Sequence, residues 1–197
     1  MNKKELAIRL SKLKPLKKLD VSLEQYQTES ELAAEILWLA YLNNDIKDKI
    51  AADLGCGNGI FGFGCLLLEA NKVYFVDKDK EALSVAKENC KSKKSGFLNI
   101  DISEFKKKTD TVFMNPPFGV QKRKADKEFL LTAMKNASVI YSIHKIESKK
   151  FIDALCKENN FKVENILEAD FLLKKTYKFH KKEKHYVKTG VWIIRRL

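Results

Sequence analysis

The residues of this sequence best suited to chemistry form the tetrapeptide Asn115-Pro-Pro-Phe118, which ends an apolar run beginning at Thr111. An exocyclic amine on a nucleobase is a poor nucleophile, because its lone pair is delocalised into the ring. The amide oxygen of Asn115 and the carbonyl of Pro116 can accept its two N–H bonds, stabilising the charge that grows as it attacks a methyl group. Pro117 fixes the turn, and Phe118 can stack on the base for about 1–3 kcal/mol. These four residues are therefore the predicted catalytic set.

A glycine-rich turn, Asp53-Leu-Gly-Cys-Gly-Asn-Gly59, follows another apolar run upstream. Glycines let the backbone approach a ligand closely, and the free N–H groups of a following helix add a positive field. Asp77 and Asp101 are expected to end the next two strands, so three carboxylates would meet beside the turn. An acidic residue there repels phosphates and suits a cationic nucleoside such as S-adenosylmethionine (SAM). Asp77 would then bind the ribose hydroxyls and Asp101 the adenine amino group.

A dinucleotide site is the alternative that these glycines leave open. Gly57-Asn-Gly59-Ile-Phe-Gly62 is a literal G-x-G-x-x-G, and Asp77 lies 20 residues after its first glycine. That is where an NAD-binding oxidoreductase places its ribose-binding carboxylate. The first glycine comes only two residues after Asp53, however, and this D-x-G-x-G-x-G order resembles that of SAM enzymes. A lone aspartate is more often a turn or helix cap, but three beside one glycine turn favour the ligand.

Short apolar runs alternate with helical segments from residue 50 onward, which indicates an α/β protein. We expect a seven-stranded, mostly parallel, Rossmann-like sheet with helices on both faces and an antiparallel hairpin at one edge. The expected strands are Ile50–Leu54, Val73–Asp77, Phe97–Asp101, Thr111–Asn115, Val139–Ser142, Lys162–Leu172 and Tyr186–Arg195. The expected helices are Ile60–Glu69, Lys80–Lys93, Asp126–Asn136 and Lys149–Asn159. Residues 1–45 would form a helical extension, with one helix ending near Pro15 and another at Glu29–Leu42, and residues 46–197 the main domain.

Basic residues outnumber acidic ones by 38 to 26, a net charge of +12 that favours a polyanionic partner. The N-terminal helix is as well explained by packing as by RNA contact. Two other segments mix cations with aromatic rings or lie beside the tetrapeptide, as RNA binding requires. The predicted RNA-binding residues are Lys122, Arg123, Lys124, Tyr177, Lys178, Phe179, His180, Lys181 and Lys182.

Apolar stretches are too short to span a bilayer, so no membrane partner is expected. The four cysteines show no CxxC and no metal-ligand spacing with the three histidines. No metal site is therefore predicted, and the cysteines are interpreted as reduced thiols of a cytoplasmic protein.

The glycine turn resembles motif I of class I methyltransferases, and Asn115-Pro-Pro-Phe118 resembles the (D/N/S)-PP-(Y/F/W) motif of amino-group methyltransferases. That group includes adenine-N6, guanine-N2 and glutamine-N5 enzymes. Further matches make the chain similar to the small archaeal and eukaryotic ribosomal-RNA N6-adenosine methyltransferases over about residues 20–197. They are Leu23-Glu-Gln-Tyr-Gln-Thr28, Ala125-Asp-x-x-Phe-Leu130, Tyr141-Ser-x-His-Lys145 and Tyr177-Lys-Phe-His-Lys-Lys182.

The resemblance implies a SAM-dependent enzyme that acts on small-subunit ribosomal RNA. It also implies that Gln25 and Thr28 close over SAM. The other residues predicted to bind the cofactor are Asp53, Gly55, Gly57, Asn58, Gly59, Ile60, Asp77 and Asp101. Eukaryotic members work with a small zinc-binding activator protein that covers an apolar sheet edge. Gln27 departs from the eukaryotic pattern, which has proline there, and the loop after Gly119 is somewhat shorter. A catalytically silent RNA-binding factor with a vestigial cofactor fold is the alternative from another functional class.

Overall fold

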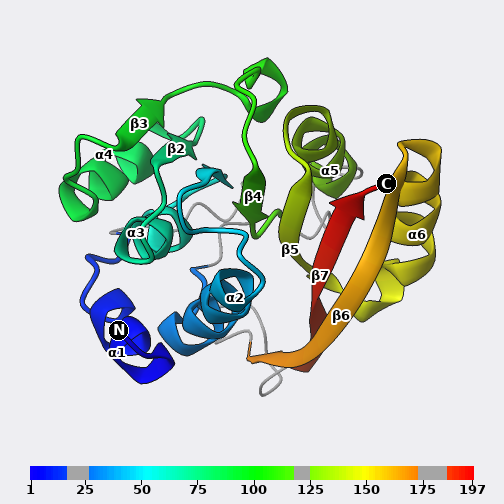
Figure 1. Ribbon diagram of the computed structural model, residues 1–197, viewed down its shortest axis with the longest axis horizontal. Coiled ribbons are helices and arrows are strands. Elements are labelled where there is room, and N and C mark those ends of the chain that lie inside the picture. Colours follow the sequence, from blue (N-terminus) through cyan, green and yellow to red (C-terminus); the bar gives the residue numbers. More distant parts are fainter. Residues whose placement is uncertain (17–26, 118–124, 173–185) are drawn as a thin grey trace, which may run out of the picture.

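The computed structural model describes residues 1–16, 27–117, 125–172 and 186–197, and its centre is a seven-stranded sheet (Figure 1). The strands are β1 (Ile50–Leu54), β2 (Lys72–Val76), β3 (Ser95–Leu98), β4 (Thr111–Met114), β5 (Val139–Lys145), β6 (Phe161–Leu172) and β7 (Tyr186–Arg196). The α-helices are α1 (Lys3–Leu10), α2 (Ser30–Leu42), α3 (Ile60–Leu67), α4 (Lys80–Asn89), α5 (Ala125–Asn136) and α6 (Lys149–Glu158). Two short 3-10 helices are η2 (Ile102–Glu104) and η3 (Ile146–Ser148).

The strand order β3-β2-β1-β4-β5-β7-β6 confirms the predicted fold class. The pairs among β1 to β5 are parallel, whereas β7 pairs antiparallel with both β5 and β6. The chain winds outward from β1 to β3 and then returns to place β4 on the other side of β1. In such open sheets, ligands bind beyond the carboxyl ends of the strands at the point where the winding reverses. The fold therefore directs attention to the loops that follow β1, β2 and β4.

Alternate side chains of each central strand enter one of two apolar cores. On one face, Phe75 and Phe113 pack with residues of α1, α2, α3 and α4. On the other face, Val112 and Trp192 pack with residues of α5, α6 and η2. Burial of both faces explains why the central strands are almost continuously apolar, as is usual for parallel strands covered by helices.

The N-terminal helix α1 is part of the first of these cores. Leu6 and Leu10, four residues apart on one helical face, are 0% and 2% exposed. A capping box between Asn2 and Glu5 begins the helix, and Lys3 and Lys4 remain on the exposed side. The packing interpretation of this cationic helix is thus confirmed.

A buried polar cluster fastens the segment between α2 and β1 to the edge hairpin. Asp45 accepts a 2.6 Å hydrogen bond from the hydroxyl of Tyr141 and two hydrogen bonds, at 3.0 and 2.8 Å, from Arg195. Because Asp45 is only 7% exposed, this pairing compensates the cost of burying its charge. The cluster joins β5 and β7 at the end of the sheet opposite the loops that follow the parallel strands.

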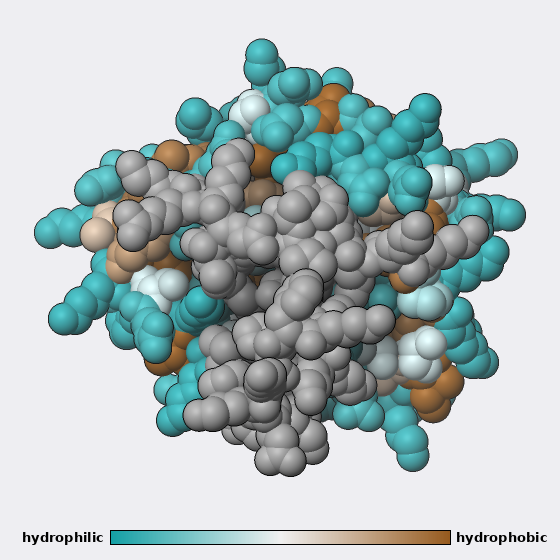
Figure 2. Space-filling model, turned by 180° about the vertical axis from the view of Figure 1, so that it is seen from behind, coloured by the Kyte–Doolittle hydropathy of each residue, from teal (hydrophilic) through white to brown (hydrophobic). Residues whose placement is uncertain are grey.

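Several predicted boundaries differ from the structure, and the difference at β3 matters most. The expected strand Phe97–Asp101 is wrong: β3 ends at Leu98, three residues before Asp101. In contrast, β5 continues to Lys145, three residues beyond the predicted end at Ser142, because β7 pairs with its last residues. Within the parts of the chain that the structure describes, no helix is long and apolar enough to cross a membrane. The described surface seen from behind is mainly hydrophilic at its periphery, with small apolar patches (Figure 2).

Candidate active site

Three neighbouring strands present the principal candidate residues at one edge of the sheet. Leu54, the last residue of β1, is in register with Val76 of β2 and with Met114 of β4. The next residue along each strand is Gly55, Asp77 and Asn115, respectively. The structure therefore brings the glycine turn, the predicted ribose ligand and the catalytic asparagine together at the carboxyl edge of three adjacent parallel strands.

The glycine turn uses left-handed backbone angles that side chains disfavour. Gly55, Gly57 and Gly59 have φ values of 67°, 54° and 83°. A Cβ added to Gly59 would lie 3.1–3.3 Å from atoms of Cys90, Ala86 and Phe75, so the position is also closely packed. Gly59 precedes α3 directly, so the turn brings the chain from the strand into the helix, with Gly55 exposed, Gly57 half-buried and Gly59 buried.

Asp53 lies beneath this turn rather than at its surface. Its side chain accepts a 2.8 Å hydrogen bond from the backbone N–H of Gly62 in the first turn of α3, and the residue is 2% exposed. Burial raises the pKa of this carboxyl to about 8, although the Gly62 hydrogen bond opposes the shift. A Cβ on Gly62 would lie 2.1 Å from the ring of Phe75, so only glycine fits here. Asp53 therefore supports the turn from below.

Asp77 connects the end of β2 to the glycine turn. Its Oδ2 accepts a 2.9 Å hydrogen bond from the N–H of Gly57, and its Oδ1 accepts one of 2.9 Å from Asp79. Burial raises the pKa of this carboxyl above its ordinary value of 3.8, against the effect of these two hydrogen bonds. A carboxylate oxygen has more than one acceptor site, so Asp77 can hold the turn and still accept bonds from a ligand.

Asp101 caps a helix in the structure. Its Oδ1 accepts hydrogen bonds from the N–H of Ser103 at 3.0 Å and from the Ser103 hydroxyl at 2.8 Å, which begins η2. The expectation that Asp101 ends a strand is thus corrected, and a cap is the ordinary role of an aspartate in this position. Its predicted contact with an adenine amino group remains a proposal.

Asn115 forms a side-chain hydrogen bond that could not be predicted from the sequence. Its Nδ2 group donates to the hydroxyl of Thr28 at a distance of 3.1 Å, and Thr28 is 5% exposed. The two branches of a side-chain amide diverge, so this contact turns the carbonyl oxygen Oδ1 away from Thr28. Pro116 is buried and Pro117 half-buried directly after it. The amide is consequently held by a residue from the N-terminal part of the chain.

Asn58 is held by the N-terminal segment too. Its Nδ2 donates to the backbone carbonyl of Lys14 at 3.3 Å, and the backbone carbonyl of Asn58 accepts a 2.9 Å hydrogen bond from Nδ2 of Asn89. Asn89 also donates to the Lys14 carbonyl at 3.1 Å. Asn58 is 3% exposed, and Ile60 is 5% exposed at the start of α3. Asn58 thus fastens the turn through hydrogen bonds, and Ile60 is buried where α3 begins.

Two contributors to the site were missed by the sequence reasoning. Lys14 contributes backbone groups to the glycine turn, for which no sequence pattern exists. Phe129 of α5 lies so close to the turn that a Cβ on Gly55 would be 3.0 Å from its ring. The matched segment Ala125-Asp-x-x-Phe-Leu130, which contains Phe129, was the available sequence signal for this residue.

A further part of the predicted site falls outside the described residues. These residues are Gln25, Phe118, Lys122, Arg123, Lys124, Tyr177, Lys178, Phe179, His180, Lys181 and Lys182.

The family model of the methyltransferase small domain matches residues 28–139, which span the glycine turn, Asp77 and Asn115. The chain belongs to the methyltransferase small-domain family.

Several relatives match this chain over nearly its whole length. The rRNA N(6)-adenosine-methyltransferase METTL5 of Danio rerio is 35% identical over 195 residues, covering 93% of each chain. An uncharacterized protein of Methanocaldococcus jannaschii is 33% identical, covering 100% of this chain and 95% of its own. A crystal structure of a Pyrococcus horikoshii protein described as an RNA methyltransferase is 42% identical with a TM-score of 0.93, covering 100% of this chain and 98% of that one.

The geometry of this methyltransferase fits SAM, its cofactor. The turn after β1 is formed by three glycines at positive φ, a Cβ on Gly57 would meet no atom of the described residues nearer than 3.9 Å, and the acidic Asp77 stands directly after β2. Gly55, Gly57 and Gly59 would border the cofactor, with Asp77 binding its ribose. Membership of the family overturns the alternative of an NAD-binding oxidoreductase, whose glycine pattern this sequence contains only by coincidence of spacing. Among the described residues no cluster of His, Cys, Asp or Glu has the arrangement of a metal site.

Proposed function

We propose that this methyltransferase modifies the N6 amino group of an adenosine in small-subunit ribosomal RNA. The observation that carries the proposal is the side-by-side placement of Gly55, Asp77 and Asn115 at the ends of three registered strands. This arrangement supports a site in which an amide that binds the target amine lies next to a turn that binds the nucleoside cofactor. The Danio rerio relative is named an rRNA N(6)-adenosine-methyltransferase, which supports the same substrate class.

The residues of the chain act by binding and orienting the amine. When bound, SAM supplies an electrophilic methyl group. Asn115 Oδ1 and the carbonyl of Pro116 accept the two N–H bonds of the target amine, and both gain strength as positive charge grows on nitrogen. Thr28 fixes the orientation of the Asn115 amide through the 3.1 Å hydrogen bond. Alignment of the reacting groups supplies most of the acceleration.

The remaining parts of the proposal concern recognition. Phe118 stacks on the target base, and the predicted RNA-binding residues around Lys122–Lys124 and Tyr177–Lys182 hold the flanking phosphates. Gln25 closes over SAM, and Asp101 contacts its adenine. A small zinc-binding activator protein would cover β3, which ends the strand order and whose residues are half-buried. We place the protein in the cytoplasm.

Two other amine acceptors compete with adenine N6. The tetrapeptide alone is compatible with guanine N2 and with glutamine N5. Relatives named ribosomal protein L11 methyltransferase match only 58 residues, or 29% of this chain, at 48% identity. The Danio rerio relative matches 93% of the chain, so its activity is the better guide. A silent RNA-binding factor is a third possibility, which methyl transfer would exclude.

Transfer of a labelled methyl group from SAM tests the substrate class. The purified protein, alone and with a candidate activator, is incubated with small-subunit rRNA, large-subunit rRNA and ribosomal protein from cells that lack its gene. We expect label in small-subunit rRNA only. Label in protein alone, or in large-subunit rRNA alone, would overturn the proposed substrate. No label in any RNA or protein would favour the silent RNA-binding factor.

A further inference from the structure

Two adjacent hollows follow α5 along the side of the molecule. One of about 560 Å³ lies between α5 and the segment 103–108, and the other, of about 550 Å³, lies at the C-terminal end of the helix. They share Lys108, Lys135 and Asn136 and thus form one continuous surface, called here the α5 groove. The site described above uses no part of it.

The α5 groove is strongly basic. The charged side chains that line it are Lys106, Lys108, Lys127, Lys135, Arg196 and Glu128. Five cations thus accompany one carboxylate, whereas the whole chain has 38 basic against 26 acidic residues. The ratio of cations to carboxylates in the groove is therefore higher than in the protein as a whole.

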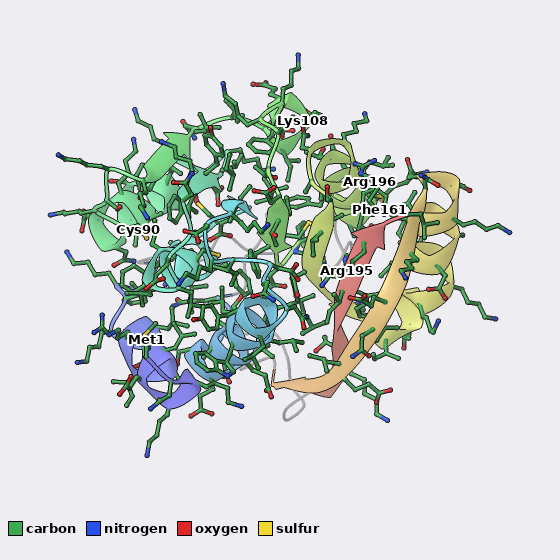
Figure 3. All side chains as sticks on the ribbon, viewed as in Figure 1. Met1, Cys90, Lys108, Phe161, Arg195 and Arg196 are labelled. Carbon is green, nitrogen blue, oxygen red and sulfur yellow. The ribbon has the colours of Figure 1, made fainter. Side chains whose placement is uncertain are left out.

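Two of these cations are held in place by the end of α5. Lys108 Nζ donates to the carbonyl of Lys135, while the guanidinium of Arg196 donates to the carbonyls of Met134 and Ala137. Arg196 also lies over the ring of Phe161, 4.6 Å from its centroid. Figure 3 labels both Lys108 and Arg196 beside α5, and their partner carbonyls belong to its C-terminal end. A helix C-terminus favours cations, so the fold assembles this charge in a fixed position.

The opposite end of the groove begins beside the active site. Phe129, which packs against Gly55, is in the same turn of α5 as the groove residues Lys127 and Glu128. Ser103, at the same end, is bonded to Asp101. With 12 residues, α5 is about 18 Å long. The groove thus leads from the edge of the cofactor site to the far end of the sheet.

We propose that the α5 groove binds the phosphodiester backbone of the RNA strand that flanks the methylated nucleotide. Lysine and arginine pair with phosphates regardless of sequence. Among the described residues that line the groove, Phe105 is the one aromatic residue, and it is 2% exposed. Bases would therefore find no stacking surface, whereas phosphates find several cations in a row. This inference rests on the proposed action on RNA and adds a surface that lies beyond the catalytic mouth.

A charge-reversed double variant tests the groove. Lys106→Glu with Lys135→Glu changes two exposed groove residues whose side chains do not form the helix-end bonds of Lys108 and Arg196. The matched control is Lys91→Glu with Lys93→Glu, two exposed lysines near β3. RNA affinity is measured between about 50 and 200 mM salt. Loss of two phosphate contacts should make the log–log salt slope shallower by roughly 1.4 for a single strand. The control should keep the slope of the wild type.

The outcomes separate this inference from the proposed function. SAM affinity and thermal unfolding must match the wild type, and the double alanine variant at the same positions replaces the glutamates if they impair folding. If the wild type methylates RNA and the groove and control variants have equal salt slopes, the proposal that the groove binds RNA is overturned. Unchanged RNA binding with reduced methylation of assembling subunits would assign the groove to a protein and would also overturn it. Failure of the wild type to methylate any RNA would instead defeat the proposed function.

Discussion

The side-chain amide of Asn115 is bonded to the hydroxyl of Thr28, a residue 87 positions earlier in the chain. This 3.1 Å bond joins the segment before α2 to the turn after β4. It makes the orientation of the catalytic amide depend on a residue that the resemblance assigns only to cofactor closure. Thr28 is accordingly a positioning residue in this account, because it acts through Asn115.

Replacement of Thr28 by valine should slow methyl transfer without a matching loss of SAM binding. Valine keeps the shape of threonine and removes the acceptor, so the amide loses a hydrogen bond worth about 1 kcal/mol. We expect kcat to fall roughly 5-fold and the SAM dissociation constant to stay near its original value. Thr28→Ser, which keeps the hydroxyl, should retain most of kcat. Weaker SAM binding with unchanged kcat would show that Thr28 serves the cofactor instead.

Replacement of Asp77 by asparagine should weaken SAM binding while the turn stays formed. Asparagine can still accept the hydrogen bond from Gly57, but it lacks the charge that strengthens bonds to ribose hydroxyls. Hydrogen bonds to charged groups contribute about 1.5–3 kcal/mol, so we expect a SAM dissociation constant roughly 10- to 100-fold higher by calorimetry.

Asp79→Asn is the matched control for this substitution. It removes the same charge two residues away, at the cap of α4, where asparagine serves equally well. SAM affinity should remain close to that of the wild type. Equal losses in both variants would indicate a general electrostatic effect in place of a ribose contact.

The buried carboxyl of Asp53 predicts a dependence of stability on pH. Its pKa is about 8 in the folded protein and near 3.8 when the chain is unfolded. Between these values the unfolded chain releases the proton while the folded one retains it, so the free energy of unfolding falls as pH rises. At about 1.4 kcal/mol per pH unit, the total effect is at most about 6 kcal/mol.

Urea unfolding of the wild type and of Asp53→Asn, without cofactor, measures this effect. Asparagine cannot ionise and can still accept the bond from Gly62. The wild-type free energy of unfolding should therefore decrease relative to that of the variant between about pH 5 and pH 8. The contribution of His144, whose pKa burial lowers to about 3, is common to both proteins and cancels. If the free energies of unfolding of the two proteins change in parallel with pH, the prediction that Asp53 is protonated in the folded protein is contradicted.

Replacement of Gly62 by alanine should destabilise the fold by overpacking. The added methyl would meet the ring of Phe75 at 2.1 Å, and such overpacking costs about 1–3 kcal/mol. Thermal unfolding should show this loss. In the double variant with Phe75→Leu, the smaller side chain should make the further cost of Gly62→Ala much smaller. An equal cost of the alanine in both backgrounds would locate its effect elsewhere.

The sequence predicted the layout of the site better than its contacts. Hydrophobic runs located β1 at its observed bounds and predicted Asp77 and Asn115 as the last residues of their strands, one position beyond where β2 and β4 end. Asp101 was misplaced because Ile100 extends the apolar pattern beyond Leu98, where strand pairing stops, and the carboxylate of Asp101 begins η2. The Thr28–Asn115 bond and the burial of Asp53 depend on how distant segments pack. No local pattern of residue types encodes such contacts.

The central claim is that Asn115 enables transfer of a methyl group to adenine N6. It is tested most directly by nucleoside mass spectrometry of small-subunit rRNA, taken from cells without the gene and treated with wild type or with Asn115→Ala. We predict N6-methyladenosine with the wild type, at least about 100-fold slower formation with the variant, and similar SAM affinity for both. N2-methylguanosine as the product, or full activity of Asn115→Ala, would contradict the account.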